Sequence, residues 1–200
     1  MKLLKLTIPL FIIISVALAT VANAAFPGWD NINTIYYNPT QDDPTNKFLE
    51  QAATELKTHL EQVSGKTFAI DTATAPAVGI FLKVDALHPD LASKNEEAFK
   101  LFSDSSGITI TGKTPIAVRH GAYTLLDKLG FRWLWSNPLW SVKPDSLPNI
   151  ELDEVQEPFF IQRKMRIAIG HLVGVKNGAG YQQQWLRRNL WGGYGWYEAR

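Results

Sequence analysis

The sequence predicts an α+β fold, a two-layer sandwich in which a mixed or antiparallel sheet carries two helices on one face. Two segments place apolar side chains at helical spacing, and six short segments rich in β-branched or aromatic residues surround them. The predicted order is β-α-β-β-β-β-α-β. With 46% hydrophobic and 20% charged residues, the 200-residue chain can bury a substantial core.

The first predicted strand covers residues 33–37, and the first predicted helix follows a turn-rich stretch. Asp43 is positioned to cap this helix, Pro44 suits its first position, and Gly65 is expected to end it. Its apolar face is the set Phe48, Leu49, Ala52, Ala53, Leu56, Leu60 and Val63.

Three of the four strands predicted between the two helices are expected at residues 67–71, 78–84 and 97–103. The segment 78–84 reads VGIFLKV and is nearly all apolar, so we expect it in the middle of the sheet. Turn residues at 104–107 then lead back as a hairpin into the next strand.

Residues 107–135 read GITITGKTPIAVRHGAYTLLDKLGFRWLW and predict a strand, a helix and a second strand. Ile108 and Ile110 alternate with threonines, which indicates a strand with one buried face. Thr114 can cap the helix, with Pro115 at its first position and Gly130 just beyond its end. The apolar stripe of this helix is Val118, Ala122, Leu125, Leu126 and Leu129, whereas His120 lies off the stripe and is expected at the surface.

This unit resembles the accessory domain that precedes the catalytic barrel in secreted glycoside hydrolases of the β-hexosaminidase/chitobiase and α-glucuronidase families. The resemblance extends from about residue 34 to about residue 163, and its specific core is residues 108–135. It implies a mixed or antiparallel sheet with helices on one face, in a domain that performs no chemistry itself.

Residues 1–24 have the pattern of a signal peptide: a basic start, an apolar run over 6–21 and a small-residue cleavage signal at 22–24. An uncleaved membrane anchor is the alternative, but Thr7, Pro9 and Ser15 interrupt the apolar run. The mature chain would begin near residue 25, exported and without a stable membrane anchor.

The absence of cysteine excludes disulfides, zinc–thiolate sites and a cysteine nucleophile. Export without disulfides indicates a bacterial periplasmic or extracellular protein. A formal net charge of +1, with dispersed lysines and arginines, gives no basis for nucleic-acid binding. No cofactor or metal site is predicted.

The predicted domains are an accessory domain at residues 25–149, a linker at 150–158 and the start of a catalytic barrel at 159–200. The linker belongs to a stretch with four prolines and several acids, which gains little from burial. Beyond it we expect a strand over 159–169 and a helix over 184–190, the first elements of a (β/α)8 barrel. About forty residues cannot form an independent domain, so the downstream barrel is the expected partner of the accessory domain.

Three residues after the linker are candidate sugar contacts. Arg163 lies in EPFFIQRK, which resembles the start of the first barrel strand in the β-hexosaminidase family, where the arginine binds sugar hydroxyls; Lys164 and Ala168 depart from that pattern. His171 follows near the C-terminal end of the same strand, and Trp191 opens an aromatic–glycine run that could stack on sugar rings. The alternatives are that Arg163 is a surface arginine, that His171 has a structural role, and that the aromatic–glycine run packs within the barrel.

Glycoside hydrolysis usually needs two carboxylates across the scissile bond, and the only acid after Pro158 is Glu198. The sequence therefore predicts no catalytic residue within these 200 positions. The leading hypothesis is an exported accessory domain of a carbohydrate-active hydrolase that acts on an oligosaccharide or polysaccharide. A stand-alone exported carbohydrate-binding module, or a purely structural domain, is the alternative.

Overall fold

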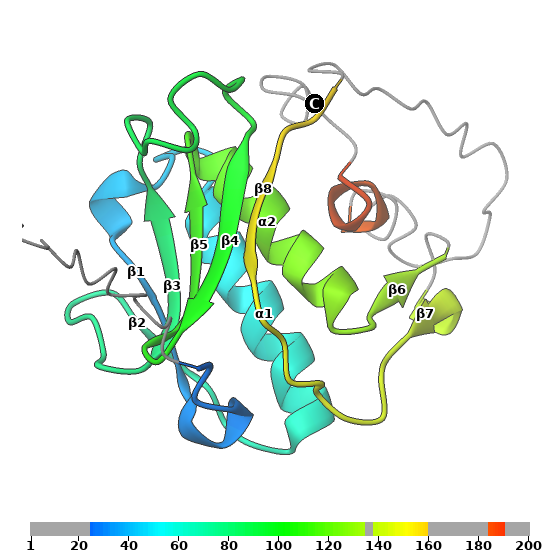
Figure 1. Cartoon of the computed structure of the whole chain (residues 1–200). Helices are drawn as coiled ribbons and strands as arrows, with labels where there is room; N and C mark the ends of the chain where they lie inside the picture. Colours follow the sequence, from blue (N-terminus) through cyan, green and yellow to red (C-terminus); the bar gives the residue numbers. More distant parts are fainter. Residues whose placement is uncertain (1–24, 135–137, 160–183, 191–200) are drawn as a thin grey trace, which may run out of the picture.

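The structure is a computed structural model that describes residues 25–134, 138–159 and 184–190. A six-stranded mixed sheet forms one layer, and helices α1 and α2 lie side by side against one of its faces (Figure 1). The predicted α+β class with a mixed sheet is confirmed. The predicted signal peptide at 1–24 lies outside the described residues.

The sheet has the strand order β2-β1-β3-β5-β4-β8. Neighbouring strands from β2 to β5 are parallel, whereas β4 pairs antiparallel with both β5 and β8. The apolar strand β3 is therefore central, as predicted. The strands are β1 (Thr34–Tyr37), β2 (Ala69–Asp71), β3 (Gly79–Val84), β4 (Phe99–Asp104), β5 (Gly107–Gly112) and β8 (Asp153–Gln156).

Helix α1 (Phe48–Ser64) begins later than the predicted start at Pro44. Asp43 instead closes a separate turn, because its carboxylate accepts hydrogen bonds from the backbone N–H groups of residues 45 and 46. The carboxylate of Asp42 caps α1 from upstream, accepting from Leu49 N at 2.8 Å and Glu50 N at 3.0 Å. Gly65 ends the helix in the left-handed conformation, as predicted.

Helix α2 (Pro115–Lys128) begins as the sequence predicts, with the Thr114 hydroxyl accepting from Ala117 N. Its predicted apolar stripe is buried, but the burial continues around the helix through residues 116–126. The prediction that His120 lies at the surface is wrong. Its side chain is 1% exposed, with Nδ1 3.5 Å from a carboxylate oxygen of Glu97, because α1, β4 and β5 enclose the helix on several sides.

The core lies between the sheet and the helix layer. Alternate residues of the inner strands, such as Ile80 in β3, Leu101 in β4 and Ile108 in β5, point at α1 and α2 and are fully buried. The close approach of α2 to the sheet depends on Gly121, where an added Cβ would lie 2.5 Å from Ile110 Cγ2. A small residue at this position lets the helix pack directly on β5.

The predicted strand at 131–135 does not join the main sheet. β6 (Arg132–Trp133) pairs with β7 (Ser141–Val142) in a separate two-stranded sheet. Three short 3-10 helices, η1 (Trp29–Asn31), η2 (Pro39–Gln41) and η3 (Pro138–Trp140), complete the irregular segments. Among the described residues no helix combines the length and the apolar character needed to cross a membrane.

The sixth strand of the sheet comes from the predicted linker. Residues 153–156 form β8 on the edge beside β4, so the interpretation of this part of 150–158 as a linker is wrong. Ion pairs hold the edge strand on both faces, Asp153 with Lys100 at 2.9 Å and Glu154 with Lys128 at 2.9 Å. A charged edge strand lacks the apolar pattern of a buried one, which explains why the sequence did not reveal it. The division into an accessory domain and a barrel remains a prediction.

Candidate functional site

The three candidate sugar contacts Arg163, His171 and Trp191 lie outside the described residues and remain predictions, as do Glu198 and all of the predicted strand at 159–169 beyond its first residue. The predicted helix at 184–190 is present over residues 184–188 and ends in a turn. This short helix lies across the helix layer and closes one side of a pocket.

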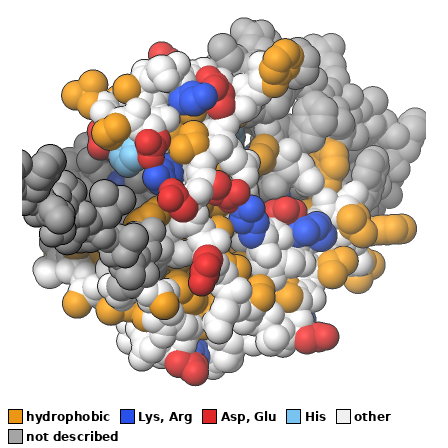
Figure 2. Space-filling view, in the orientation of Figure 1, with side chains coloured by type: hydrophobic (Ala, Val, Ile, Leu, Met, Phe, Trp, Pro, Cys, Tyr) orange, Lys and Arg blue, Asp and Glu red, His pale blue; other side chains and the backbone are white. Residues whose placement is uncertain are grey.

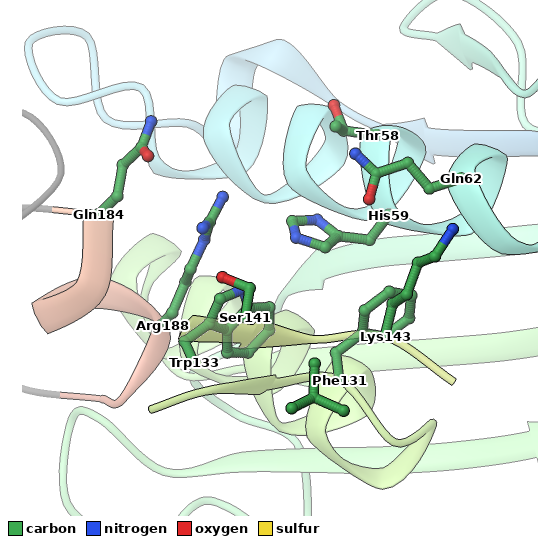
Figure 3. A pocket seen from close by; sticks show the side chains of 10 residues that line it. Thr58, His59, Gln62, Phe131, Trp133, Ser141, Lys143, Gln184 and Arg188 are labelled. Atoms are coloured by element: carbon green, nitrogen blue, oxygen red, sulfur yellow. The ribbon is translucent and has the colours of Figure 1, made fainter. Parts of the chain in front are cut away.

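The pocket has a volume of about 300 Å³ and lies where three parts of the chain meet (Figure 3). Helix α1 forms one wall, the β6–β7 sheet a second, and the short helix at 184–188 a third. We call it the junction pocket. Its lining residues are Thr58, His59, Gln62, Phe131, Trp133, Ser141, Val142, Lys143, Gln184 and Arg188.

Glu55 on α1 anchors the short helix by an ion pair beside the pocket. Arg188 donates to its carboxylate through Nε, 3.2 Å from Oε2, and through Nη2, 3.0 Å from the same oxygen and 3.4 Å from Oε1. Both side chains are only 19% exposed, so water screens this pair less than a surface pair. The contact joins positions 133 residues apart in the sequence.

Trp133 on β6 is the second anchor, and it acts through both its ring and its backbone. The guanidinium carbon of Arg188 lies 5.3 Å from the ring centroid, within cation–π range. The carbonyl oxygen of Trp133 accepts from the indole N–H of Trp185 at 2.8 Å and from the side-chain amide of Asn189 at 3.1 Å. The segment 184–190 is therefore held to the helix layer and β6 by side chains of several chemical types.

His59 lies between the aromatic side chains and the Glu55–Arg188 pair. Its ring makes edge contacts with Phe131, at a centroid distance of 5.1 Å, and with Trp133, at 5.4 Å. Nδ1 is 2.8 Å from the carbonyl oxygen of Glu55, and because a carbonyl only accepts, Nδ1 carries the proton. Burial lowers the pKa of His59, although the nearby Glu55 groups oppose the shift, so the neutral ring with an accepting Nε2 is the favoured form.

The described lining of the junction pocket combines aromatic rings with polar side chains. None of its ten lining residues is a carboxylate, and the neighbouring Glu55 is neutralised by Arg188. The lining instead offers amides, hydroxyls, one imidazole and the ammonium of Lys143. Within the part of the chain that the structure describes, no cluster of three or more acidic or histidine side chains could hold a metal ion.

Sequence reasoning did not single out Glu55, His59 or Trp133 as site residues. The spacing of Glu55 and His59, four positions apart on a predicted helix, was the available signal, because it places both side chains on one face. Their partner Arg188 lies far away in the chain, and no local pattern predicts that contact.

The burial of His59 predicts a stability loss on mild acidification. A base with a lowered folded-state pKa binds fewer protons in the folded than in the unfolded protein, so the free energy of unfolding should fall as the pH drops below about 6.5. Urea unfolding between pH 7.5 and 5 measures the slope, which should become flatter in His59→Gln. The Gln62→Ala variant changes a neighbouring lining residue and should keep the parental slope; an unchanged slope in His59→Gln would contradict the prediction.

Comparison with known proteins gives similarities of structure only. No family model matches the chain, and no curated protein matches it. The solved structures with a similar fold include a family GH115 4-O-methyl-α-glucuronidase with specificity for decorated arabinogalactans (21% identity over 68% of this chain, TM-score 0.46). They also include an N-acetyl-β-hexosaminidase of Streptomyces plicatus (18% over 70%, TM-score 0.45) and a GH20 exo-β-N-acetylglucosaminidase of Vibrio harveyi (15% over 71%, TM-score 0.43).

All three are glycoside hydrolases, and the chain spans 18%, 25% and 18% of their respective lengths. At these identities the likeness concerns the fold alone.

Proposed function

We propose that this chain is the N-terminal accessory domain, with the beginning of the catalytic barrel, of an exported bacterial glycoside hydrolase of the α-glucuronidase or β-hexosaminidase type. In this role residues 25–156 fold into the α+β layer pair, with β8 completing its sheet, and the chain after residue 158 supplies the first barrel elements. The substrate would be an oligosaccharide or polysaccharide, bound with the help of Arg163, His171 and Trp191.

The docking of residues 184–190 on the helix layer is the observation that carries this proposal. Trp185 and Arg188 belong to the segment predicted to begin the barrel, and they bind Trp133 and Glu55 of the predicted accessory domain. Leu186 in the same short helix is only 6% exposed. An accessory domain needs a surface of this kind, because it acts on catalysis only through the chain that packs on it.

The part of the sequence that carries the family resemblance adds support to the proposal. Residues 108–133, which carry most of its specific core, include β5, α2 and β6, and β6 is the element that Trp185, Arg188 and Asn189 contact. Among the residues that the structure describes, the lining of the junction pocket includes no carboxylate. A stand-alone binding module would have no need of this attachment to a second predicted unit.

The proposal predicts where glycosidase activity resides. The 200-residue chain should release no product above buffer from aryl glucuronides and aryl N-acetylglucosaminides, because positioning groups without an acid pair cannot protonate a leaving group. A protein expressed from the reading frame extended beyond Arg200 should release product from at least one of them.

Glu198→Gln in the 200-residue chain is the matched control. Turnover by the 200-residue chain that persists in this variant would place an acid pair within the first domain and would contradict the accessory role. An extended frame that encodes no barrel would contradict the proposed enzyme.

A further inference from the structure

The face of the sheet opposite the helices carries a cavity of its own. In the strand register Thr111 of β5 lies between Lys83 of β3 and Lys100 of β4, and Thr109 lies beside Phe102 one row further along. These five side chains share the open face, because their neighbours Ile108, Ile110 and Leu101 point into the core. They line a cavity of about 490 Å³, within the range of about 300–1,000 Å³ typical of small-molecule sites.

A charged clamp shapes one side of this cavity, which we call the sheet-face cavity. Lys100 Nζ lies 2.6 Å from Asp90 in the loop after β3 and 2.9 Å from Asp153 on β8. The hydrogen bond to Asp90 and the other carboxylate raise the pKa of Lys100, and its side chain is only 16% exposed. The clamp ties the loop to the sheet, and that loop brings Asp85 and His88 to the rim of the cavity.

Carboxylates outnumber ammonium groups around the cavity, with Asp85, Asp90, Asp104 and Asp153 against Lys83 and Lys100. Two carboxylates pair with Lys100, and the Asp104 carboxylate already accepts from the backbone N–H and hydroxyl of Ser106 at 2.7 Å and 2.6 Å. Lys83 and Asp85 remain as one charge of each sign. Figure 2 shows the same mixture, with positive and negative side chains interspersed on this face. The surroundings of the cavity therefore carry a net negative charge, which an anionic ligand would meet as repulsion and a neutral ligand would not.

We propose that the sheet-face cavity binds a neutral glycan chain. The half-buried Phe102 ring offers an apolar surface for the C–H face of a pyranose. Lys83, Asp85 and His88, with the hydroxyls of Ser106 and Thr109, provide donors and acceptors for the sugar hydroxyls. The choice of a glycan over other neutral polyols rests on the proposed function. The site itself lies on the face of the sheet opposite the helix layer, away from the junction pocket.

Calorimetric titration of the 200-residue chain tests this site. The probes are cellohexaose, xylohexaose and chitohexaose, with hexagalacturonate as the charged comparison. We expect at least one neutral hexasaccharide to bind and hexagalacturonate to bind more weakly. Phe102→Ala should weaken binding at least tenfold, and Phe159→Ala removes a ring of the same type that is 90% exposed and does not line the cavity, so it should bind as the parent does.

Thr109→Val removes one hydroxyl while keeping a β-branched side chain in the strand, and it should weaken binding even if Phe102→Ala is poorly folded. Three results would overturn the proposal: no binding of any neutral probe, stronger binding of hexagalacturonate, or parental affinity in both cavity variants. Each of these leaves the aryl-glycoside test of the extended protein unaffected, so failure of this site and failure of the proposed function are distinguishable.

Discussion

Gly121→Val should lower the free energy of unfolding by roughly 1–3 kcal/mol. A Cβ at this position would lie 2.5 Å from Ile110 Cγ2 and 3.1 Å from the Phe99 ring, and valine adds two further methyl groups. Both neighbours are fully buried or nearly so, which leaves them little room to move. Helix propensity alone favours valine over glycine, so any loss must come from packing between α2 and the sheet.

Urea unfolding of the parent and the variant measures this difference. Thr54→Val is the matched control, because it places the same side chain at an exposed position of α1 and should change stability by less than about 0.5 kcal/mol. Equal stability of Gly121→Val and the parent would show that α2 can move away from β5 at no cost. Packing of this helix against the sheet would then not be the main source of stability.

The residues that the sequence predicted well are those whose structure depends on local chemistry. Thr114 and Pro115 start α2, Gly65 and Gly130 adopt positive φ beyond the two helices, and the apolar strand β3 lies in the centre of the sheet. Capping, backbone conformation and burial of an apolar strand are decided within a few residues. These features therefore needed no knowledge of distant contacts.

The errors arise where distant contacts decide the structure. β8 is acidic and reads as a linker, yet Lys100 and Lys128 from other elements pair with it at the edge of the sheet. His120 lies off the apolar stripe of α2, but it is buried beside Glu97 because the helix is enclosed on more than one side. Hydrophobic periodicity describes one buried face, and it does not predict a polar residue that is buried by elements from elsewhere in the chain.

In the candidate site, too, the features set by local sequence were predictable and those set by distant contacts were not. The aromatic character of residues 131–135 was visible in the sequence, but its use as the anchor for residues 184–190 was not. Glu55 and Arg188 meet only because α1 and the short helix pack together. The residues predicted from family resemblance, Arg163, His171 and Trp191, lie outside the described residues and await a test of their own.

Trp133→Ala should have the largest effect on the junction between the two predicted units. The side chain is 6% exposed, stacks on Phe131, contacts His59 and Tyr123 edge-on, and supports the guanidinium of Arg188. Truncating a buried tryptophan typically lowers the free energy of unfolding by about 3–5 kcal/mol. Beyond this loss, the short helix at 184–188 would lose the ring against which Arg188 packs.

Two measurements separate these effects. Thermal unfolding should show the loss of stability, and trypsin digestion followed by mass spectrometry should show faster cleavage after Arg187 and Arg188, the basic residues of the docked segment. Trp140→Ala removes a tryptophan that is 58% exposed and should leave both readouts close to those of the parent.

Faster cleavage after Arg187 and Arg188 below the melting temperature of the variant would mean that the segment opens locally while the α+β layers remain folded. Parental cleavage in a destabilised Trp133→Ala would instead show that Glu55 and the Trp133 carbonyl hold the segment without the ring. The docking surface would then be α1 and the β6 backbone.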